Sequence, residues 1–179
     1  MNPEFLREGN AIHDAQNPDR IVVGFADEIA REKLNELYKS YNCTKLECIP
    51  RTAELIKYAS NSFLATKISF VNEIANMSNV WGIDFQEVAE GMGLDSRISS
   101  EFLRAGAGFG GSCFPKDVKA LAAAAKNSKV ESLMLKATLE VNDLQPKLIV
   151  KMTEERLGVI KGKDIAVLGL AFKPDTDDV

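Results

Sequence analysis

The feature that most constrains the fold is an uninterrupted helical pattern from Thr52 to Trp81. Neither Gly nor Pro occurs in this stretch, and its apolar residues recur at helical intervals. A helix of about 30 residues is about 45 Å long, which is enough to cross a whole domain. Its apolar face is too wide for a helix that buries one side only. We therefore expect it to span a domain or to line a subunit interface.

Shorter elements are expected on both sides of this helix. Apolar periodicity predicts helices over 27–41, 85–92, 115–126 and 131–157. Short apolar runs predict buried strands over 21–25 and 164–172, and a second short strand is expected near 45–49. Residues 2–20 are expected to form a loop, and Pro146 should kink or interrupt the last helix. The chain is thus predicted to be mainly α, with a helical block flanked by partial α/β units, and to be part of a larger enzyme.

Composition excludes several classes of protein. The net charge is −4 and the basic residues are scattered, so no nucleic-acid partner is expected. No apolar run reaches about 18 residues and no signal peptide is apparent, so we expect no membrane association and a cytoplasmic location. Three cysteines make no disulfide framework, and Cys43 and Cys48 are expected to be reduced thiols. We predict no metal site.

The sequence FGGSCFPKD at 109–117 is the most informative segment. Its glycines let the backbone come close to a ligand, and Cys113 lies just before a predicted helix. The N–H groups and dipole of a helix start favour a thiolate, which suits covalent catalysis. A buried structural cysteine beside a tight turn is the alternative that the residues leave open. The single histidine, His13, lies far upstream, so lysine or carboxylate partners are favoured over a Cys–His pair.

Lys57 and Asn61 on the long helix are candidate partners of the cysteine. They are four residues apart and so share one helix face. An ammonium and an amide beside an apolar stripe can stabilise an oxyanion. A solvated helix edge is the alternative explanation of this pair.

With these residues in view, the chain resembles the UDP-glucose/GDP-mannose dehydrogenase family, most closely its UDP-glucose-oxidising members. The resemblance covers essentially the full chain, and its four motifs occur in order at family-like separations. The motifs are NPEFLREG at 2–9, ELIKYASN at 54–61, GFGGSCFPKD at 108–117 and GLAFKPDTD at 169–177.

The resemblance implies a mainly α chain that contains parts of three domains, a central helical domain with one long helix and partial α/β Rossmann-like segments on either side. Residues 1–49 correspond to the C-terminal tail of the NAD-binding domain, and residues 50–160 to a central helical domain. Residues 161–179 correspond to the start of the C-terminal domain that binds the nucleotide sugar. The family template also implies a homodimer formed through the central domain, with NAD as the cofactor.

The chemistry implied by the resemblance is the four-electron oxidation of the C6 alcohol of UDP-glucose to UDP-glucuronate. Cys113 would add to the intermediate aldehyde to give a thiohemiacetal, and a thioester would follow and be hydrolysed. Lys57 would stabilise the oxyanion or act as a base, and Asn61 would donate to the same oxygen. Asp117 would help to position or activate water. Glu4 would act near the sugar as a base or through an ordered water.

Binding roles follow from the same resemblance. Glu8 and Lys116 correspond to positions near NAD, and Arg97 to an arginine that reaches the partner subunit's site. The other substrate-contacting positions are Phe5, Leu6, Arg104, Phe109, Gly110, Phe172 and Lys173.

Two departures from the family pattern limit these expectations. The chain has no G-x-G-x-x-G, so the main NAD site is expected outside it and the chain alone is expected not to turn over. Ser99 and Ser100 replace a Gly-Asn or Gly-Pro pair, which leaves UDP-N-acetyl-hexosamines and GDP-mannose as alternative substrates. A non-catalytic dimerisation module and a hydroxyacid dehydrogenase with a similar helical domain are the alternatives of other classes.

Overall fold

The structure is a computed structural model that describes residues 1–174 and 176–178. Asp175, in the last of the four sequence motifs, and Val179 lie outside the described residues. The chain divides into two compact units. The first consists of Met1–Ser60 with Lys173–Asp177, and the second of Asn61–Phe172 with the residues that follow Asp177. The elements are α1 (Ala11–Gln16), β1 (Arg20–Gly24), α2 (Glu28–Leu37), β2 (Thr44–Cys48), α3 (Pro50–Trp81), α4 (Phe85–Gly93), α5 (Phe114–Asn127) and α6 (Leu133–Leu157).

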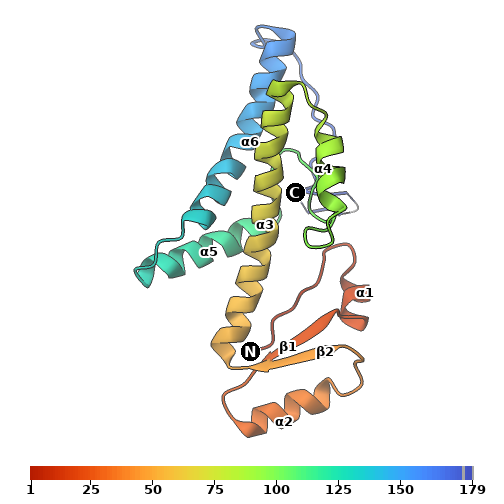
Figure 1. The fold of residues 1–179 in the computed structure, drawn as a ribbon, viewed down its shortest axis with the longest axis vertical. Coiled ribbons are helices and arrows are strands. Elements are labelled where there is room, and N and C mark those ends of the chain that lie inside the picture. The colour runs from red at the N-terminus through yellow and green to blue at the C-terminus, as the bar shows by residue number, and fades with distance from the viewer. Residues whose placement is uncertain (175, 179) are drawn as a thin grey trace. The chain divides into compact units, whose positions relative to one another are not determined.

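The first unit contains a small parallel sheet of β1 and β2 joined through helix α2 (Figure 1). Strand β1 carries the buried run Ile21–Val23, with Val22 opposite Leu46 of β2. This strand–helix–strand unit agrees with the apolar runs and the amphipathic pattern of the sequence. Strand β1 ends at Gly24, where a Cβ atom would lie 2.8 Å from Pro50 Cα. Only glycine therefore permits this close approach of the strand to the start of α3.

Helix α3 confirms the long helix that the sequence predicts (Figure 1). It begins at Pro50 rather than at Thr52, and Gly82 ends it with a φ of +68°. Proline fits the first turn because its missing N–H would have no helical partner there. The stop at Gly82 follows from the left-handed conformation that glycine adopts easily.

The second unit is built from the remainder of α3 with α4, α5 and α6. Its core gathers around Ala65, Phe109 and Val118, which are buried. Phe114 and Leu139 pack against them. Helices α3 and α6 lie side by side, as the hydrogen bond from Ser69 Oγ to the Thr138 carbonyl shows (Figure 1). The core therefore fixes the start of α5 between these two long helices.

Two sequence-based expectations about elements were wrong, and of the two outcomes expected at Pro146 the interruption does not occur. Residues 2–20 contain a short helix, α1, which has no side-chain cap and was too short for its period to be detected. Pro146 lies inside α6 without interrupting it. Residues 164–172 form no strand and are exposed, because a strand needs a neighbour to pair with and none of the described residues pairs with this segment.

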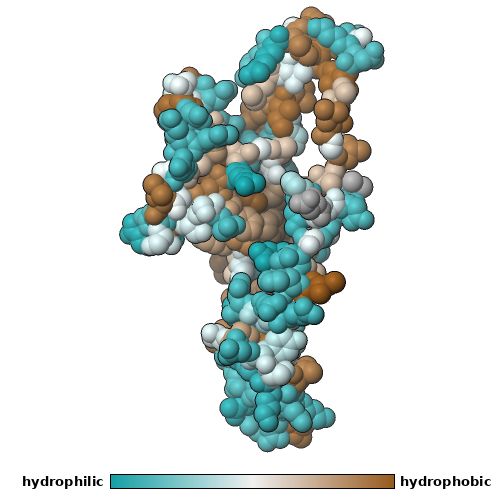
Figure 2. All heavy atoms as spheres, turned by 90° about the vertical axis from the view of Figure 1, so that its right-hand side faces the viewer, coloured by the Kyte–Doolittle hydropathy of each residue, from teal (hydrophilic) through white to brown (hydrophobic). Residues whose placement is uncertain are grey.

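Hydrophobic side chains reach the surface of the second unit. Figure 2 shows such residues on one face of the molecule, coloured brown. On α3, Phe63 and Phe70 are 66% and 52% exposed. None of the helices within residues 1–174 and 176–178 combines the length and the apolar character that crossing a membrane requires.

Candidate functional site

In the first unit, Glu4 and Lys57 form a direct ion pair. Lys57 Nζ donates to Glu4 Oε1 over 2.8 Å and to the Glu4 carbonyl oxygen over 2.7 Å. The Lys57 side chain is only 17% exposed, so the ammonium is held in a partly desolvated position. The Phe5 ring lies 5.5 Å from Lys57 Nζ and 4.0 Å from the Arg20 guanidinium carbon. Two cations thus lie against the Phe5 ring, and one of them, Lys57, pairs with the carboxylate of Glu4.

The segment that carries Glu4 is held at both of its ends. Asn2 Nδ2 donates to the Val22 carbonyl over 2.7 Å, which ties the segment to β1. After Glu4, the Asp14 carboxylate accepts from the Arg7 backbone N–H and from the Arg7 guanidinium. The hydrogen bond from the Arg7 side chain is the main reason that the pKa of Asp14 lies well below its ordinary value of 3.8. Asp14 therefore acts as a buried anchor for the turn that follows Glu4.

In the second unit, Cys113 is exposed at the start of α5. It occupies the N-cap position, and its carbonyl accepts from the Asp117 N–H over 2.9 Å, which closes the first turn. Its Sγ lies 3.7 Å from Ser112 Oγ. Pro115 is in the first turn, as its position in the sequence predicts. The structure thus places the thiol at an accessible helix start and not in a core.

Asp117 follows Cys113 by one helical turn and is buried. Asn61 Nδ2 on α3 donates to Asp117 Oδ2 over 2.6 Å, and Lys116 Nζ donates to Oδ1 over 2.7 Å. Asp117 is 2% exposed, whereas the Lys116 side chain is 66% exposed. The structure therefore brings together two of the predicted catalytic residues, Asn61 and Asp117. Their contact lies at the first turn of α5, which follows Cys113. Lys57 and Glu4 belong to the first unit.

The predicted substrate-contacting residues occupy different environments. Phe109 is buried in the core of the second unit, and the Phe172 ring approaches Gly111, where a Cβ atom would lie 2.9 Å from the ring. Gly111 has a φ of +73°, so both its backbone and its surroundings require glycine. Arg104 is exposed. Arg97 is also exposed, and its bonds to Asp95 raise the pKa of its guanidinium.

In the first unit, Lys173 Nζ donates to the Glu8 carbonyl over 2.8 Å. Leu6 is 43% exposed, and its N–H donates to Glu4 Oε2. These contacts bring residues of the first and last sequence motifs together. The bond from Lys173 involves the backbone carbonyl of Glu8. The role of Glu8 near NAD therefore stays a prediction.

A group of amide side chains around the glycine-rich loop was missed by the sequence analysis. The signal was present, because these amides occur at spacings of three and four on two helices that face a core. The four residues are Asn72 and Asn76 on α3, and Asn142 and Gln145 on α6. All four donate to or accept from one another or the loop peptides of Gly106 and Phe109.

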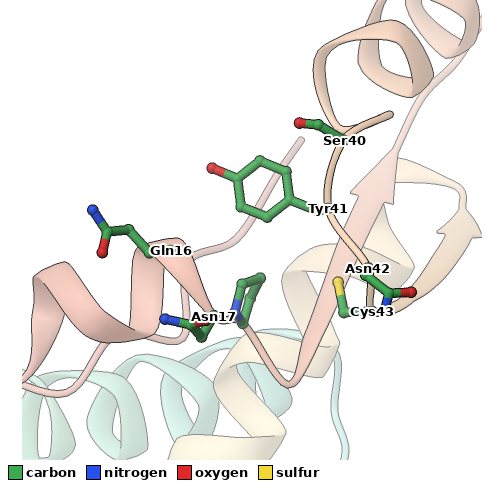
Figure 3. A pocket seen from close by; sticks show the side chains of 7 residues that line it. Gln16, Asn17, Ser40, Tyr41, Asn42 and Cys43 are labelled. Carbon is green, nitrogen blue, oxygen red and sulfur yellow. The ribbon is translucent and has the colours of Figure 1, made fainter.

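A hollow in the first unit lies apart from these groups. Figure 3 shows its lining, which comes from the end of α1 and from the segment before β2. The residues that line it are Gln16, Asn17, Pro18, Ser40, Tyr41, Asn42 and Cys43. Because none of the candidate residues lines this hollow, we assign it no role in the chemistry.

The strand–helix–strand unit does not fit the pyrophosphate of a dinucleotide. The Asp27 carboxylate caps the start of α2 by accepting from the Ala30 N–H over 2.8 Å, so a negative charge already occupies this helix start. Gly24 at the turn is closed off by Pro50 and Ala53. The β1–α2 turn therefore offers no phosphate cradle.

Comparison with known proteins agrees with the sequence motifs. Residues 51–144 match the central domain of the UDP-glucose/GDP-mannose dehydrogenase family, and residues 1–42 match the NAD binding domain of that family. The chain is 52% identical over 178 residues to the UDP-glucose 6-dehydrogenase YwqF of Bacillus subtilis, which covers 99% of the chain and 40% of that protein. It is 50% identical over 184 residues to the UDP-glucose 6-dehydrogenase AglM of Haloferax volcanii, covering 100% of the chain and 43% of that relative.

A solved structure shows the same likeness. The UDP-glucose dehydrogenase of the hyperthermophilic archaeon Pyrobaculum islandicum superimposes with a TM-score of 0.97 at 51% identity, covering 99% of the chain and 41% of that protein. The chain spans about 40% of the length of the relatives that it matches.

Proposed function

The chain belongs to the UDP-glucose/GDP-mannose dehydrogenase family, and from this premise we propose that it carries the catalytic residues of a UDP-glucose 6-dehydrogenase. The family uses NAD, as the match of residues 1–42 to its NAD binding domain indicates. The observation that carries the proposal is the position of Cys113. It is exposed at the start of α5, one turn before a buried carboxylate that Asn61 holds in place.

Cys113 is the covalent nucleophile of this proposal. After the C6 alcohol has been oxidised to the aldehyde, the Cys113 sulfur adds to the carbonyl carbon and forms a thiohemiacetal. Loss of the C6 hydrogen as a hydride and of the proton on the C6 hydroxyl oxygen gives a thioester, which water cleaves to the carboxylate and the free thiol. NAD supplies the hydride acceptor when bound, and the β1–α2 turn contributes no site for its pyrophosphate.

Asn61 and Asp117 serve the same carbonyl group. The Asn61 amide has two N–H donors, so one can hold Asp117 while the other donates to the substrate oxygen. Each Asp117 oxygen accepts one hydrogen bond from Asn61 or Lys116, and each retains a lone pair that can orient water toward the thioester. Lys57, held by Glu4, supplies the positive charge for the oxyanion, and Glu4 acts as the second carboxylate near the sugar.

The substrate preference of the proposal rests on the relatives. YwqF and AglM are described as UDP-glucose 6-dehydrogenases and share about half of their residues with the chain over the matched length. UDP-N-acetyl-hexosamines and GDP-mannose are the alternative substrates. Phe5, Leu6, Arg104, Phe109, Gly110, Phe172 and Lys173 are proposed to contact the nucleotide sugar, with Glu8 and Lys116 near NAD.

We also propose the domain division 1–49, 50–160 and 161–179, and a homodimer formed through the central helical domain. The exposed phenylalanines of α3 support the dimer, because a partner that covers large apolar side chains on one helix face removes their surface from water and so stabilises the assembly. Arg97 reaches the partner's site in this assembly. The three free cysteines are consistent with the reducing cytoplasm.

The test is a chimera in which this chain replaces the matching 178 residues of YwqF. We expect the chimera to convert UDP-glucose to UDP-glucuronate with two NADH formed for each acid. Cys113→Ser should lower acid formation by roughly 10³-fold or more, since it removes the covalent nucleophile. Cys43→Ser, an equivalent change at a half-buried thiol, is the matched control and should leave the rate nearly unchanged.

Other outcomes of this experiment favour the alternatives. A folded chimera without activity toward any nucleotide sugar would indicate a dimerisation module. Acid formation that survives Cys113→Ser would favour chemistry without a covalent intermediate, as in hydroxyacid dehydrogenases. A preference for GDP-mannose or a UDP-N-acetyl-hexosamine would change the substrate and keep the mechanism.

A further inference from the structure

The glycine-rich loop before Cys113 is held by side-chain amides on two helices. Asn142 Oδ1 accepts from the Phe109 N–H over 2.7 Å, and Asn142 Nδ2 donates to the Phe109 carbonyl over 3.1 Å. Both main-chain groups of Phe109 are therefore held by a single side chain. This arrangement replaces the ladder of hydrogen bonds that a helix or a strand would provide.

The same pattern recurs three residues earlier in the loop. Gly106 N–H donates to Asn72 Oδ1 over 2.7 Å, and the Gly106 carbonyl accepts from Gln145 Nε2 over 3.0 Å. Gln145 Oε1 in turn accepts from Asn76 Nδ2 over 2.8 Å. Two residues of the loop, Gly106 and Phe109, are thus fixed through their main-chain groups to side chains of α3 and α6, the two long helices of the second unit.

The loop then has little freedom before it reaches the cysteine. Phe109 is fixed in its backbone by Asn142 and in its side chain by the core around Ala65 and Val118. Cys113 follows four residues later and is bonded through its carbonyl to the N–H of Asp117, which Asn61 holds. The sulfur therefore lies on a short segment that is anchored on both sides.

Gly108 shows how closely Asn142 approaches the loop. The residue has a φ of +106°, and a Cβ atom there would lie 2.6 Å from Asn142 Oδ1. No side chain can occupy this space unless the amide moves. Gly106 differs, because nothing lies within 4 Å of the position that its Cβ would take.

We propose that Asn142 is a positioning residue for Cys113, because its amide clamps Phe109 and so fixes the loop that delivers the sulfur to the start of α5. The inference rests on the proposed function for one point, that the Cys113 sulfur is the nucleophile. The hydrogen bonds that hold the loop all lie within the second unit. Asn142 touches no reacting atom and acts through the loop. Displacing a reacting group by about 1 Å can cost roughly 100-fold in rate, so such a clamp matters to catalysis.

The test uses the full chain without NAD or substrate. Amide hydrogen exchange, followed by NMR, is measured for Asn142→Ala at Phe109 and at Asp117, whose N–H closes the first turn of α5. We expect exchange at both amides to accelerate about tenfold or more relative to core amides of α3, because the clamp and then the first turn are lost. Alkylation of Cys113 by iodoacetamide at pH 7, normalised to Cys43, should fall several-fold as the sulfur leaves the helix start.

A matched control separates this effect from a general loss of stability. Thr138→Val removes the hydroxyl contact to Thr66 in the same α3–α6 interface and leaves the loop bonds intact. This variant should change amide hydrogen exchange by a similar factor at Phe109, at Asp117 and at the core amides of α3. It should leave the normalised alkylation of Cys113 unchanged. Asn142→Asp, which keeps the acceptor for the Phe109 N–H and loses the donor, should give an intermediate effect.

Gly108→Ala provides a second approach if Asn142→Ala does not fold. Its Cβ would displace the amide, so it should reproduce the accelerated exchange at Phe109, whereas Gly106→Ala should not. The inference is overturned if neither Asn142→Ala nor Gly108→Ala changes exchange at Asp117 or the alkylation of Cys113. This outcome is independent of the proposed function, which the chimera tests through acid formation.

Discussion

At the scale of single residues, Asp14 shows how one carboxylate fixes a segment that contains a proposed catalytic group. It accepts from the backbone and side chain of Arg7 and from the Asn10 amide. These bonds shape the turn that follows Glu4. A carboxylate that is bonded only in the folded state links folding to pH.

The first prediction concerns this linkage. The pKa of Asp14 is lower in the folded chain than its ordinary value of 3.8, chiefly because of the Arg7 side-chain bond. The stabilisation is therefore fully present above about pH 4 to 5 and is lost as the pH falls further through the folded pKa. Asp14→Asn should lower Tm at pH 7, and this deficit should shrink steadily below about pH 4.

The measurement is thermal unfolding followed by circular dichroism from pH 7 to pH 2. Asp19→Asn, which removes an exposed carboxyl near the same helix, corrects for the change in net charge. A Tm deficit of Asp14→Asn that stays constant across this range would contradict the assigned role.

At the scale of elements, the sequence predicted what depends on local pattern and missed what depends on partners. Helix α3 follows from its own periodicity, so its length was predicted within two residues at its start. Residues 164–172 have the composition of a buried strand, but pairing with a neighbour decides whether a strand forms. Helix α1 has six residues, too few to display a helical period.

The residues of the candidate site show the same difference between what local pattern predicts and what depends on distant partners. Asn61 was selected from its place on a helix face, and Cys113 from the glycine turn before a helix. The contact of Asn61 with Asp117 joins residues 56 apart in the chain, so no local spacing predicts it. Asn142 went unnoticed because its importance comes from the loop that it holds and not from its neighbours in sequence.

The second prediction concerns the contact between α3 and α5. Asn61→Ala leaves the buried Asp117 Oδ2 without its 2.6 Å donor, since alanine has no polar group to replace the amide. An unsatisfied buried carboxylate oxygen costs roughly 3 kcal/mol, so we expect the free energy of unfolding to fall by about that amount. Urea unfolding measures the change. Asn127→Ala, at the exposed end of α5, is the matched control and should stay within about 0.5 kcal/mol.

A small effect of Asn61→Ala would have a clear meaning. If it destabilises the chain by less than about 1 kcal/mol, Asp117 is accessible to water in solution and needs no donor from α3. Asp117 would then not be the rigid carboxylate that the proposed mechanism uses to orient water.

At the scale of the whole molecule, the exposed apolar residues of α3 are the surface on which the proposed dimer depends. Phe63 and Phe70 are seven residues apart, which places them on one face of the helix. Both are more than half exposed. A face of this kind on a long helix is typical of an interface between helices, because covering it removes two aromatic rings from water. This is the structural basis of the proposed dimer.

The last prediction tests that interface. Sedimentation velocity should give a mass twice the 19.6 kDa of one chain. Phe63→Asp with Phe70→Asp should weaken association by roughly 10⁵-fold or more, since each of the two chains loses two aromatic anchors of about 2 kcal/mol each and every 1.4 kcal/mol is tenfold. Leu94→Asp with Val159→Asp makes the same chemical change at exposed apolar residues outside α3 and should leave the dimer intact. If both double variants dissociate equally, general surface hydrophobicity causes the association. If the unaltered chain sediments as a monomer at micromolar concentration, the α3 face does not by itself hold two chains together.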